Sequence, residues 1–159
     1  MSGTPIRAPA APASPEPPQP RSREHVYRVN VQFGDCDPAG IVFFPNFARW
    51  MDQASLAYFM AMGLPPWREL TATRGIVGTP VLETHTRFIN PATYGETLEV
   101  HTSVTAWERK VFRHRHQVMR GDLLLCEGTE VRAFVVHHPD DPSRLKAVPP
   151  PEDIVAMCR

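Results

Sequence analysis

The sequence predicts an α+β domain in which one long amphipathic helix packs against a single antiparallel sheet. Three observations lead to this prediction. One helix-like stretch, with apolar residues at three- and four-residue steps, follows a short strand. Four more strand-like runs then follow with short connections, which favours an antiparallel meander. The 159 residues are enough for one domain with a core of ordinary size.

The first predicted strand follows a segment that we expect to be disordered. Residues 1–23 are rich in Pro, Ala and Ser, and seven of the eighteen prolines lie in the first twenty positions. Such a composition cannot offset its ordering entropy by apolar burial. The folded domain is therefore expected to span residues 24–159. Its first strand covers residues 27–33, where apolar and polar side chains alternate.

The long helix is expected from Asn46 to Met62. Gly63 and the prolines that follow it are typical of a helix C-terminus. One apolar stripe runs along this helix and consists of Phe47, Trp50, Met51, Ala54, Tyr58 and Ala61.

The remaining strands are expected at residues 79–89, 96–107, 110–120 and 123–137. Residues 149–159 are expected to end in a short helix. Five antiparallel strands wrapped around one long central helix form a hot-dog fold. The open edges of such a sheet need a partner, so we expect a homo-oligomer.

The composition excludes several classes of protein. The 17 basic residues equal the 17 acidic ones, which argues against a nucleic-acid partner. The sequence lacks an apolar run of about 18 residues and a secretory signal, so we expect no membrane partner. The three cysteines lack metal-ligand spacing and are expected to be free thiols of a cytoplasmic protein. The strand histidines also lack such spacing, so we predict no metal and expect these histidines to be paired or exposed.

The segment FGDCDPAGIVFFPNF, residues 33–47, carries the most informative pattern. Asp37 precedes a proline, which favours extended backbone, and Gly40 can adopt a positive φ without steric cost. The pattern therefore places a carboxylate on a constrained turn near the start of the helix. By itself it also fits an acid that only satisfies backbone N–H groups, which is the role we assign to Asp35. Cys36 is assigned to packing.

This segment, together with GLPPW at residues 63–67 and RGIVGTP at residues 74–80, resembles the 4-hydroxybenzoyl-CoA thioesterase family of hot-dog enzymes. The similarity runs from about Tyr27 to the C-terminus. It implies an acyl-CoA thioesterase that needs no cofactor, takes part in aromatic degradation and hydrolyses an aromatic acyl-CoA, first of all 4-hydroxybenzoyl-CoA. It also implies a homotetramer, built as a dimer of dimers, with active sites at the dimer interface.

The resemblance assigns catalytic roles to two residues. Asp37 aligns with the catalytic carboxylate of the family, which can attack the thioester as a nucleophile or activate a water as a general base. The sequence leaves both routes open. The backbone N–H of Phe44 aligns with the oxyanion donor, because the first N–H groups of a helix lack partners within it. The side chain of Phe44 is assigned to the core.

The resemblance also assigns the acyl-binding residues. Asp52, Trp67 and Thr79 match residues that surround the aromatic acyl group, where an acid or hydroxyl can bond a phenol and a Trp can pack on a ring. In a dimer they can come from opposite protomers. By position alone, Asp52 lies off the apolar stripe and fits a solvated surface acid.

The coenzyme A contacts are assigned to Arg109, Lys110 and Lys146, since Arg and Lys bind phosphates through charge-assisted hydrogen bonds. The segment departs from the family at Glu108, where a cation is expected, and at Val111, where a hydroxyl is expected. We therefore expect one phosphate contact to be lost or re-routed. Without the resemblance, these cations also fit an ordinary polar strand face.

Two alternatives to this function stay open. One is a thioesterase for a short or branched acyl-CoA, and the other is a non-catalytic acyl-CoA-binding protein. A hot-dog dehydratase would need a histidine in the active-site segment, and residues 33–47 contain none.

Overall fold

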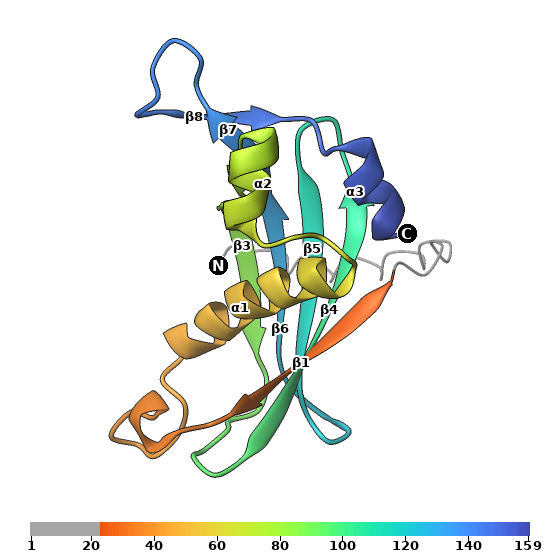
Figure 1. The fold of residues 1–159 in the computed structure, drawn as a ribbon. Helices are drawn as coiled ribbons and strands as arrows, with labels where there is room; N and C mark the ends of the chain where they lie inside the picture. The colour runs from red at the N-terminus through yellow and green to blue at the C-terminus, as the bar shows by residue number, and fades with distance from the viewer. Residues whose placement is uncertain (1–22) are drawn as a thin grey trace, which may run out of the picture.

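The computed structural model describes residues 23–159, so residues 1–22 of the segment predicted to be disordered, 1–23, lie outside the described residues. Its main feature is a five-stranded antiparallel sheet of order β1-β4-β5-β6-β3, with one long helix, α1, lying across one face (Figure 1). The α+β prediction of one helix on five strands is therefore confirmed. The elements of this layer pair are β1 (Glu24–Asn30), α1 (Pro45–Ala61), β3 (Val81–Phe88), β4 (Thr97–Trp107), β5 (Phe112–Arg120) and β6 (Leu123–Arg132).

Helix α1 follows the predicted apolar stripe closely. Ala61 is exposed, whereas Ser55 and Phe59 join the buried face. The helix ends where Gly63 adopts a φ of 103°, a left-handed conformation that favours glycine. On the sheet side, a Cβ added to Gly128 of β6 would lie 2.7 Å from Sδ of Met51. A glycine at this position therefore allows the close packing of helix on sheet.

Strand β1 ends three residues earlier than predicted. Asn30 makes its last pair, with Thr97 of β4, and a short 3₁₀ helix, η1 (Phe33–Asp35), follows. The N–H of Gln32 donates to Oδ2 of Asp35 at 2.9 Å, which turns the chain away from the sheet. The alternation that predicted a strand up to Phe33 was wrong at this end, because local side-chain bonding replaces the ladder there.

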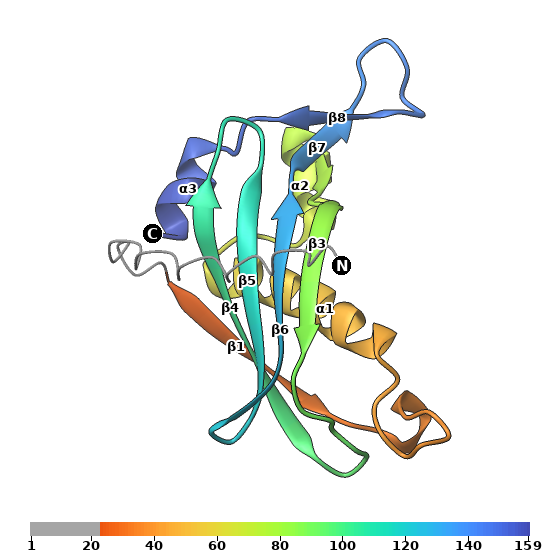
Figure 2. The same cartoon turned by 180° about the vertical axis from the view of Figure 1, so that it is seen from behind.

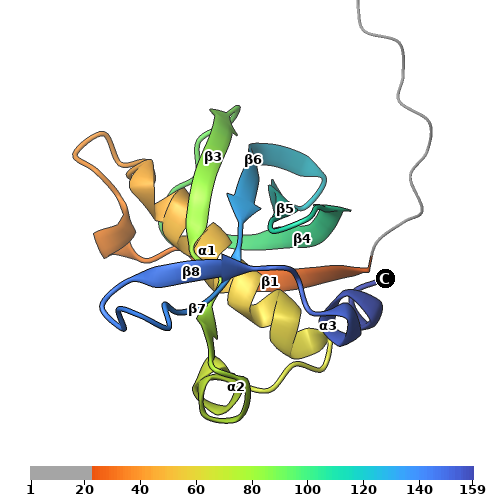
Figure 3. The same ribbon diagram turned by 90° about the horizontal axis from the view of Figure 1, so that it is seen from above.

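A second, three-stranded sheet was not predicted. It has the order β2-β7-β8 and includes β2 (Ile76–Gly78), β7 (Phe134–His137) and β8 (Leu145–Val148). The predicted strand 123–137 is divided at Ala133 between the two sheets. β7 and β8 lie at the same end of the molecule as α2 (Trp67–Arg74) (Figure 1), and in the view from above they pass in front of the middle of α1 (Figure 3).

Two further helices complete the domain. The predicted C-terminal helix is confirmed as α3 (Glu152–Met157). Helix α2 was missed, because only Leu70 among its residues is buried and the helix therefore has no apolar stripe. None of the helices in residues 23–159 is long and apolar enough to span a membrane.

The sheet keeps one open face and two open edges. In the described part of the chain no helix covers the face opposite α1 (Figure 2). The edge strands are β1 and β3, and seven of the eight residues of β3 are exposed. Val81, Leu82 and Phe88 are among them. An exposed apolar edge of this kind favours pairing with another chain.

Candidate active site

Asp37 lies on a tight turn just before α1. The N–H of Gly40 donates to the carbonyl of Asp37 at 2.9 Å, and Gly40 takes a φ of 78°. The N–H of Ala39 donates to Oδ1 of Asp37 at 2.8 Å. The second carboxylate oxygen, Oδ2, has no hydrogen-bond partner within residues 23–159. The turn therefore holds a half-buried carboxylate with one oxygen available for chemistry.

Asp35 uses both carboxylate oxygens to build this turn. Oδ2 accepts the N–H of Gln32, and Oδ1 pairs with Arg49 of α1 at 2.7 Å. The side chain of Asn46 donates to the Asp35 carbonyl at 2.8 Å. These contacts agree with the role predicted for Asp35 as a turn residue.

The backbone N–H of Phe44 is available at the start of α1. Pro45 has no N–H, and the amides of Asn46 and Phe47 donate to the carbonyls of Phe43 and Phe44. No acceptor for the Phe44 N–H lies within hydrogen-bonding distance in the described part of the chain. Phe44 is 62% exposed, and its ring packs edge-on against Phe88. Its assignment to the core was wrong, because the ring lies on the outside of the helix start.

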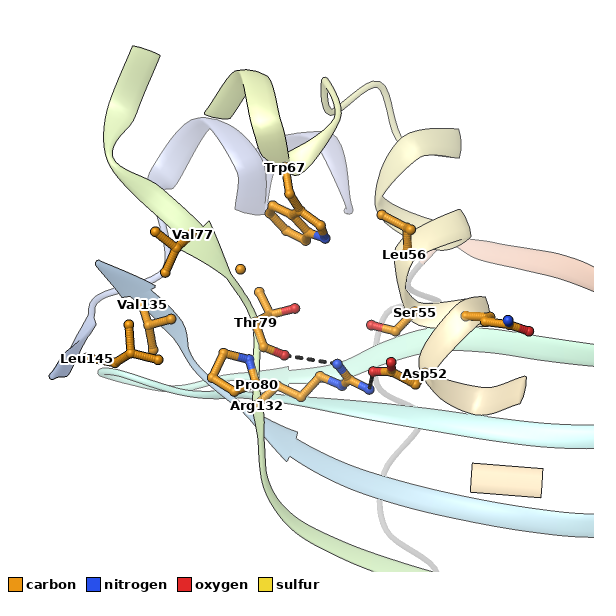
Figure 4. A pocket seen from close by; sticks show the side chains of 12 residues that line it. Asp52, Ser55, Leu56, Trp67, Val77, Thr79, Pro80, Arg132, Val135 and Leu145 are labelled. Carbon is orange, nitrogen blue, oxygen red and sulfur yellow. Dashed lines mark hydrogen bonds and ion pairs between the residues drawn. The ribbon is translucent and has the colours of Figure 1, made fainter. Parts of the chain in front are cut away.

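Asp52, Trp67 and Thr79 lie together at a cleft of about 450 Å³, as Figure 4 shows. They come from three elements: α1, the start of α2, and the link between β2 and β3. In this view Trp67 stands above Thr79, and Asp52 lies to the right, beside the guanidinium of Arg132. The structure thus brings the three predicted acyl-binding residues together. The remaining lining residues are Gln53, Ser55, Leu56, Val77, Gly78, Pro80, Arg132, Val135 and Leu145.

Arg132 is the site residue that the sequence analysis missed. Its side chain is 4% exposed and pairs with Oδ1 of Asp52 at 2.8 Å. It also donates to the carbonyl of Thr79 at 2.9 Å and to Glu130 at 2.8 Å. The sequence did contain a signal for this residue, because Glu130 and Arg132 are two residues apart and therefore share one face of a strand. Two charges on a buried face must pair with other groups.

The ion pair continues into the core behind the cleft. Oε2 of Glu130 lies 3.1 Å from Nε2 of His116, and Nδ1 of His116 lies 2.8 Å from the Thr102 hydroxyl. Burial raises the pKa of Glu130, but its bonds and charge interactions with His116 and Arg132 outweigh burial, so the pKa is lowered overall. Glu130 is thus held as a carboxylate.

His114 differs from the prediction for the strand histidines. It is fully buried, and neither ring nitrogen has a hydrogen-bond partner among the described residues. Burial, followed by the charges of His116 and Arg132, lowers its pKa well below the usual value, so the ring stays neutral. His114, His116 and Glu130 offer possible metal-ligand atoms within 4.8 Å of one another. Oε2 of Glu130 already accepts from Arg132 and His116, however.

One chain does not bring all the predicted site residues together. Asp37 and Phe44 do not line the cleft that holds Asp52. Phe44 instead lines a smaller apolar pocket of about 210 Å³, together with Phe88 and Ile89 at the end of β3. The acidic turn at Asp37 and the cleft at Asp52 are therefore separate within one chain.

The predicted CoA-binding cations also lie outside the cleft. Arg109 and Lys110 are exposed on the turn between β4 and β5, and neither forms an ion pair with any residue in 23–159. Lys146 is exposed on β8, next to a residue that lines the cleft. Glu108 pairs with Arg113 at 2.7 Å. A local ion pair thus occupies the position where a cation was expected.

Comparisons with known proteins agree with this geometry. Residues 31–157 match the Thioesterase-like superfamily. The chain is 42% identical over 142 residues to the 4-hydroxybenzoyl-CoA thioesterase of Pseudomonas sp. (strain CBS-3). The aligned region covers 86% of this chain and 99% of that enzyme.

Solved structures give the same result. A 4-hydroxybenzoyl CoA thioesterase variant complexed with 4-hydroxybenzoyl CoA superposes with a TM-score of 0.80 at 39% identity, over 86% of this chain and 99% of the other. A gentisyl-coenzyme A thioesterase superposes with a TM-score of 0.70 at 28% identity, over 84% of this chain and 98% of the other. The resemblance stated from the motifs and the hot-dog fold class are thereby confirmed.

Proposed function

Since the chain belongs to the Thioesterase-like superfamily, we propose that it hydrolyses an aromatic acyl-CoA, first of all 4-hydroxybenzoyl-CoA, to the free acid and CoA. The observation that carries this proposal is the cleft that combines Trp67 with the Asp52–Arg132 pair. Its volume of about 450 Å³ suits a small acyl group.

The cleft supports recognition of a hydroxylated ring. The indole of Trp67 can pack against a flat acyl group. Oδ1 of Asp52 is occupied by Arg132, so the second oxygen can accept a hydrogen bond from a phenol. A site built to bond a substrate hydroxyl rejects analogues without it far better than an apolar slot does.

We propose that the two half-sites meet across a dimer. Strand β3 begins at Val81, two residues after Thr79 of the cleft, and ends at Phe88, next to Phe44. If β3 pairs antiparallel with the partner's β3 about a two-fold axis, the start of one strand lies opposite the end of the other. The cleft of one protomer then approaches the acidic turn of its partner. The exposed apolar residues of β3 support this edge as the interface, and two such dimers would form the tetramer.

In such a composite site, the thioester carbonyl oxygen accepts the N–H of Phe44. A backbone donor of this kind lowers the barrier by about 3–4 kcal/mol in a comparable hydrolase. By the nucleophilic route, Oδ2 of Asp37 attacks the carbonyl carbon, the CoA thiolate leaves, and water hydrolyses the resulting anhydride. By the general-base route, Asp37 takes a proton from the attacking water. Both routes give the same acid and CoA.

The nucleotide of CoA is assigned to Arg109, Lys110 and Lys146. Arg109 and Lys110 have no competing ion pair within residues 23–159, which supports their availability to phosphates. Because Glu108 engages Arg113, we expect fewer phosphate contacts here than the resemblance implies.

The proposal is tested by release of free CoA thiol from 4-hydroxybenzoyl-CoA, benzoyl-CoA and a straight-chain acyl-CoA. We expect the highest kcat/KM for 4-hydroxybenzoyl-CoA. Asp37→Asn should abolish hydrolysis but retain acyl-CoA binding, because the Asn side-chain oxygen can still accept the N–H of Ala39.

Three results would contradict the proposal. Equal kcat/KM for the three substrates would show that the cleft does not recognise the substrate hydroxyl. Binding without thiol release would favour a non-catalytic acyl-CoA-binding protein. Near-normal turnover by Asp37→Asn would remove Asp37 from the mechanism.

A further inference from the structure

We infer that Arg132 is a positioning residue that sets the acyl specificity of the cleft, although it need not contact the reacting atoms. Its guanidinium holds the Asp52 carboxylate and the Thr79 backbone in one fixed arrangement. The hydroxyl of the acyl group can therefore donate to a carboxylate that is already oriented. The inference rests on the proposed function, because it concerns how that same cleft reads its substrate.

The contacts of Arg132 connect three separate elements. Nη2 donates to Asp52 of α1, Nη1 donates to the Thr79 carbonyl before β3, and Nε donates to Glu130 of its own strand β6. All three nitrogens of the guanidinium are therefore engaged. Figure 4 shows the bonds to Thr79 and Asp52. A lysine ammonium is a compact point charge and lacks the planar fork that such an arrangement uses.

Asp52 depends on this contact for its orientation. Its side chain is 68% exposed, whereas that of Arg132 is 4% exposed. An exposed carboxylate that is not held samples several rotamers, and ordering it when substrate binds costs free energy. The bond to a buried guanidinium orders Asp52 in advance. A pre-ordered acceptor strengthens discrimination between acyl groups with and without a hydroxyl.

Arg132 is itself fixed from behind. Glu130 is 4% exposed and also bonds His116, whose other ring nitrogen contacts the Thr102 hydroxyl. This polar chain crosses from β6 through β5 to β4. The guanidinium is thus anchored in the sheet and leaves little freedom to the groups it holds in the cleft.

The test is the ratio of kcat/KM for 4-hydroxybenzoyl-CoA to that for benzoyl-CoA. Arg132→Lys should lower this ratio about tenfold, while kcat/KM for benzoyl-CoA changes by less than about threefold. Asp52→Asn alone should lower this ratio about as much as Arg132→Lys does. The double variant should show little further loss, because the two residues act as one unit. Arg120→Lys is the matched control and should leave the ratio unchanged, since Arg120 pairs with Glu96 and does not line the cleft.

The outcomes separate this inference from the proposed function. A wild type that does not prefer the hydroxylated substrate overturns both. A wild type that prefers it, with the ratio kept in Arg132→Lys, overturns the inference alone, and so does an equal loss for both substrates. If Arg132→Lys does not fold, Glu130→Gln loosens the same guanidinium. That variant should also lower the ratio, and an unchanged ratio overturns the inference.

Discussion

Replacing Phe44 by proline removes one hydrogen atom from the proposed oxyanion site. Phe44 has a φ of −53°, which lies within the range that a proline ring imposes. Its N–H has no acceptor among the described residues, so the substitution breaks no hydrogen bond of the folded chain. Phe44 is 62% exposed, so losing its ring removes little burial.

The expected loss is about 10²–10³ in kcat, equivalent to about 2.7–4 kcal/mol of barrier, as for removal of one oxyanion donor in a comparable hydrolase. Phe44→Ala is the matched control, because it removes the ring but keeps the N–H. Its cost is limited to edge-on contacts such as that with Phe88, which are worth about 0.5–1.5 kcal/mol of stability each.

The assay compares kcat of the two variants with 4-hydroxybenzoyl-CoA, and thermal unfolding checks that both fold. Phe44→Ala should keep most of the wild-type kcat, whereas Phe44→Pro should lose it. If a folded Phe44→Pro variant stays within about threefold of Phe44→Ala, this amide does not stabilise the transition state, and the oxyanion assignment is wrong.

Two more predictions concern packing and the nucleotide. Gly128→Ala should lower the free energy of unfolding in urea by about 1–3 kcal/mol, because the new Cβ would lie 2.7 Å from Sδ of the buried Met51. Gly34→Ala is the control, because no atom lies within 4 Å of the added Cβ, and it should change the free energy of unfolding by less than about 0.5 kcal/mol. Equal losses of stability in the two variants would refute the close-packing argument. Arg109→Ala and Lys110→Ala should each raise KM for the CoA thioester about tenfold through a lost charge-assisted bond. KM for an N-acetylcysteamine thioester, which has no nucleotide, should not change, and a parallel rise would place these cations elsewhere in the mechanism.

Several elements could be predicted because their signals are local. The apolar stripe from Phe47 to Ala61 predicted α1, and all of its members except Ala61 are buried. Strand-like runs predicted β3, β4 and β5 with small errors at their ends, whereas the run predicted at residues 123–137 contains both β6 and β7. Helix α2 escaped prediction because its stability comes from a few contacts and not from a repeating face. Strand β1 was predicted too long, because the carboxylate of Asp35 forms a local turn that periodicity does not report.

The sequence alone determined the acidic turn, since a proline, a glycine and a helix start within ten residues constrain the backbone locally. The resemblance to a thioesterase family also came from the sequence, through the motifs at residues 33–47, 63–67 and 74–80. Only the tertiary structure decided how the acyl cleft is built. Arg132 meets Asp52 and Thr79 across separations of 80 and 53 residues, and no short-range pattern encodes such a meeting. The same holds for the separation of Asp37 from that cleft in one protomer, because chain folding, and not residue spacing, sets which surfaces remain open to a partner.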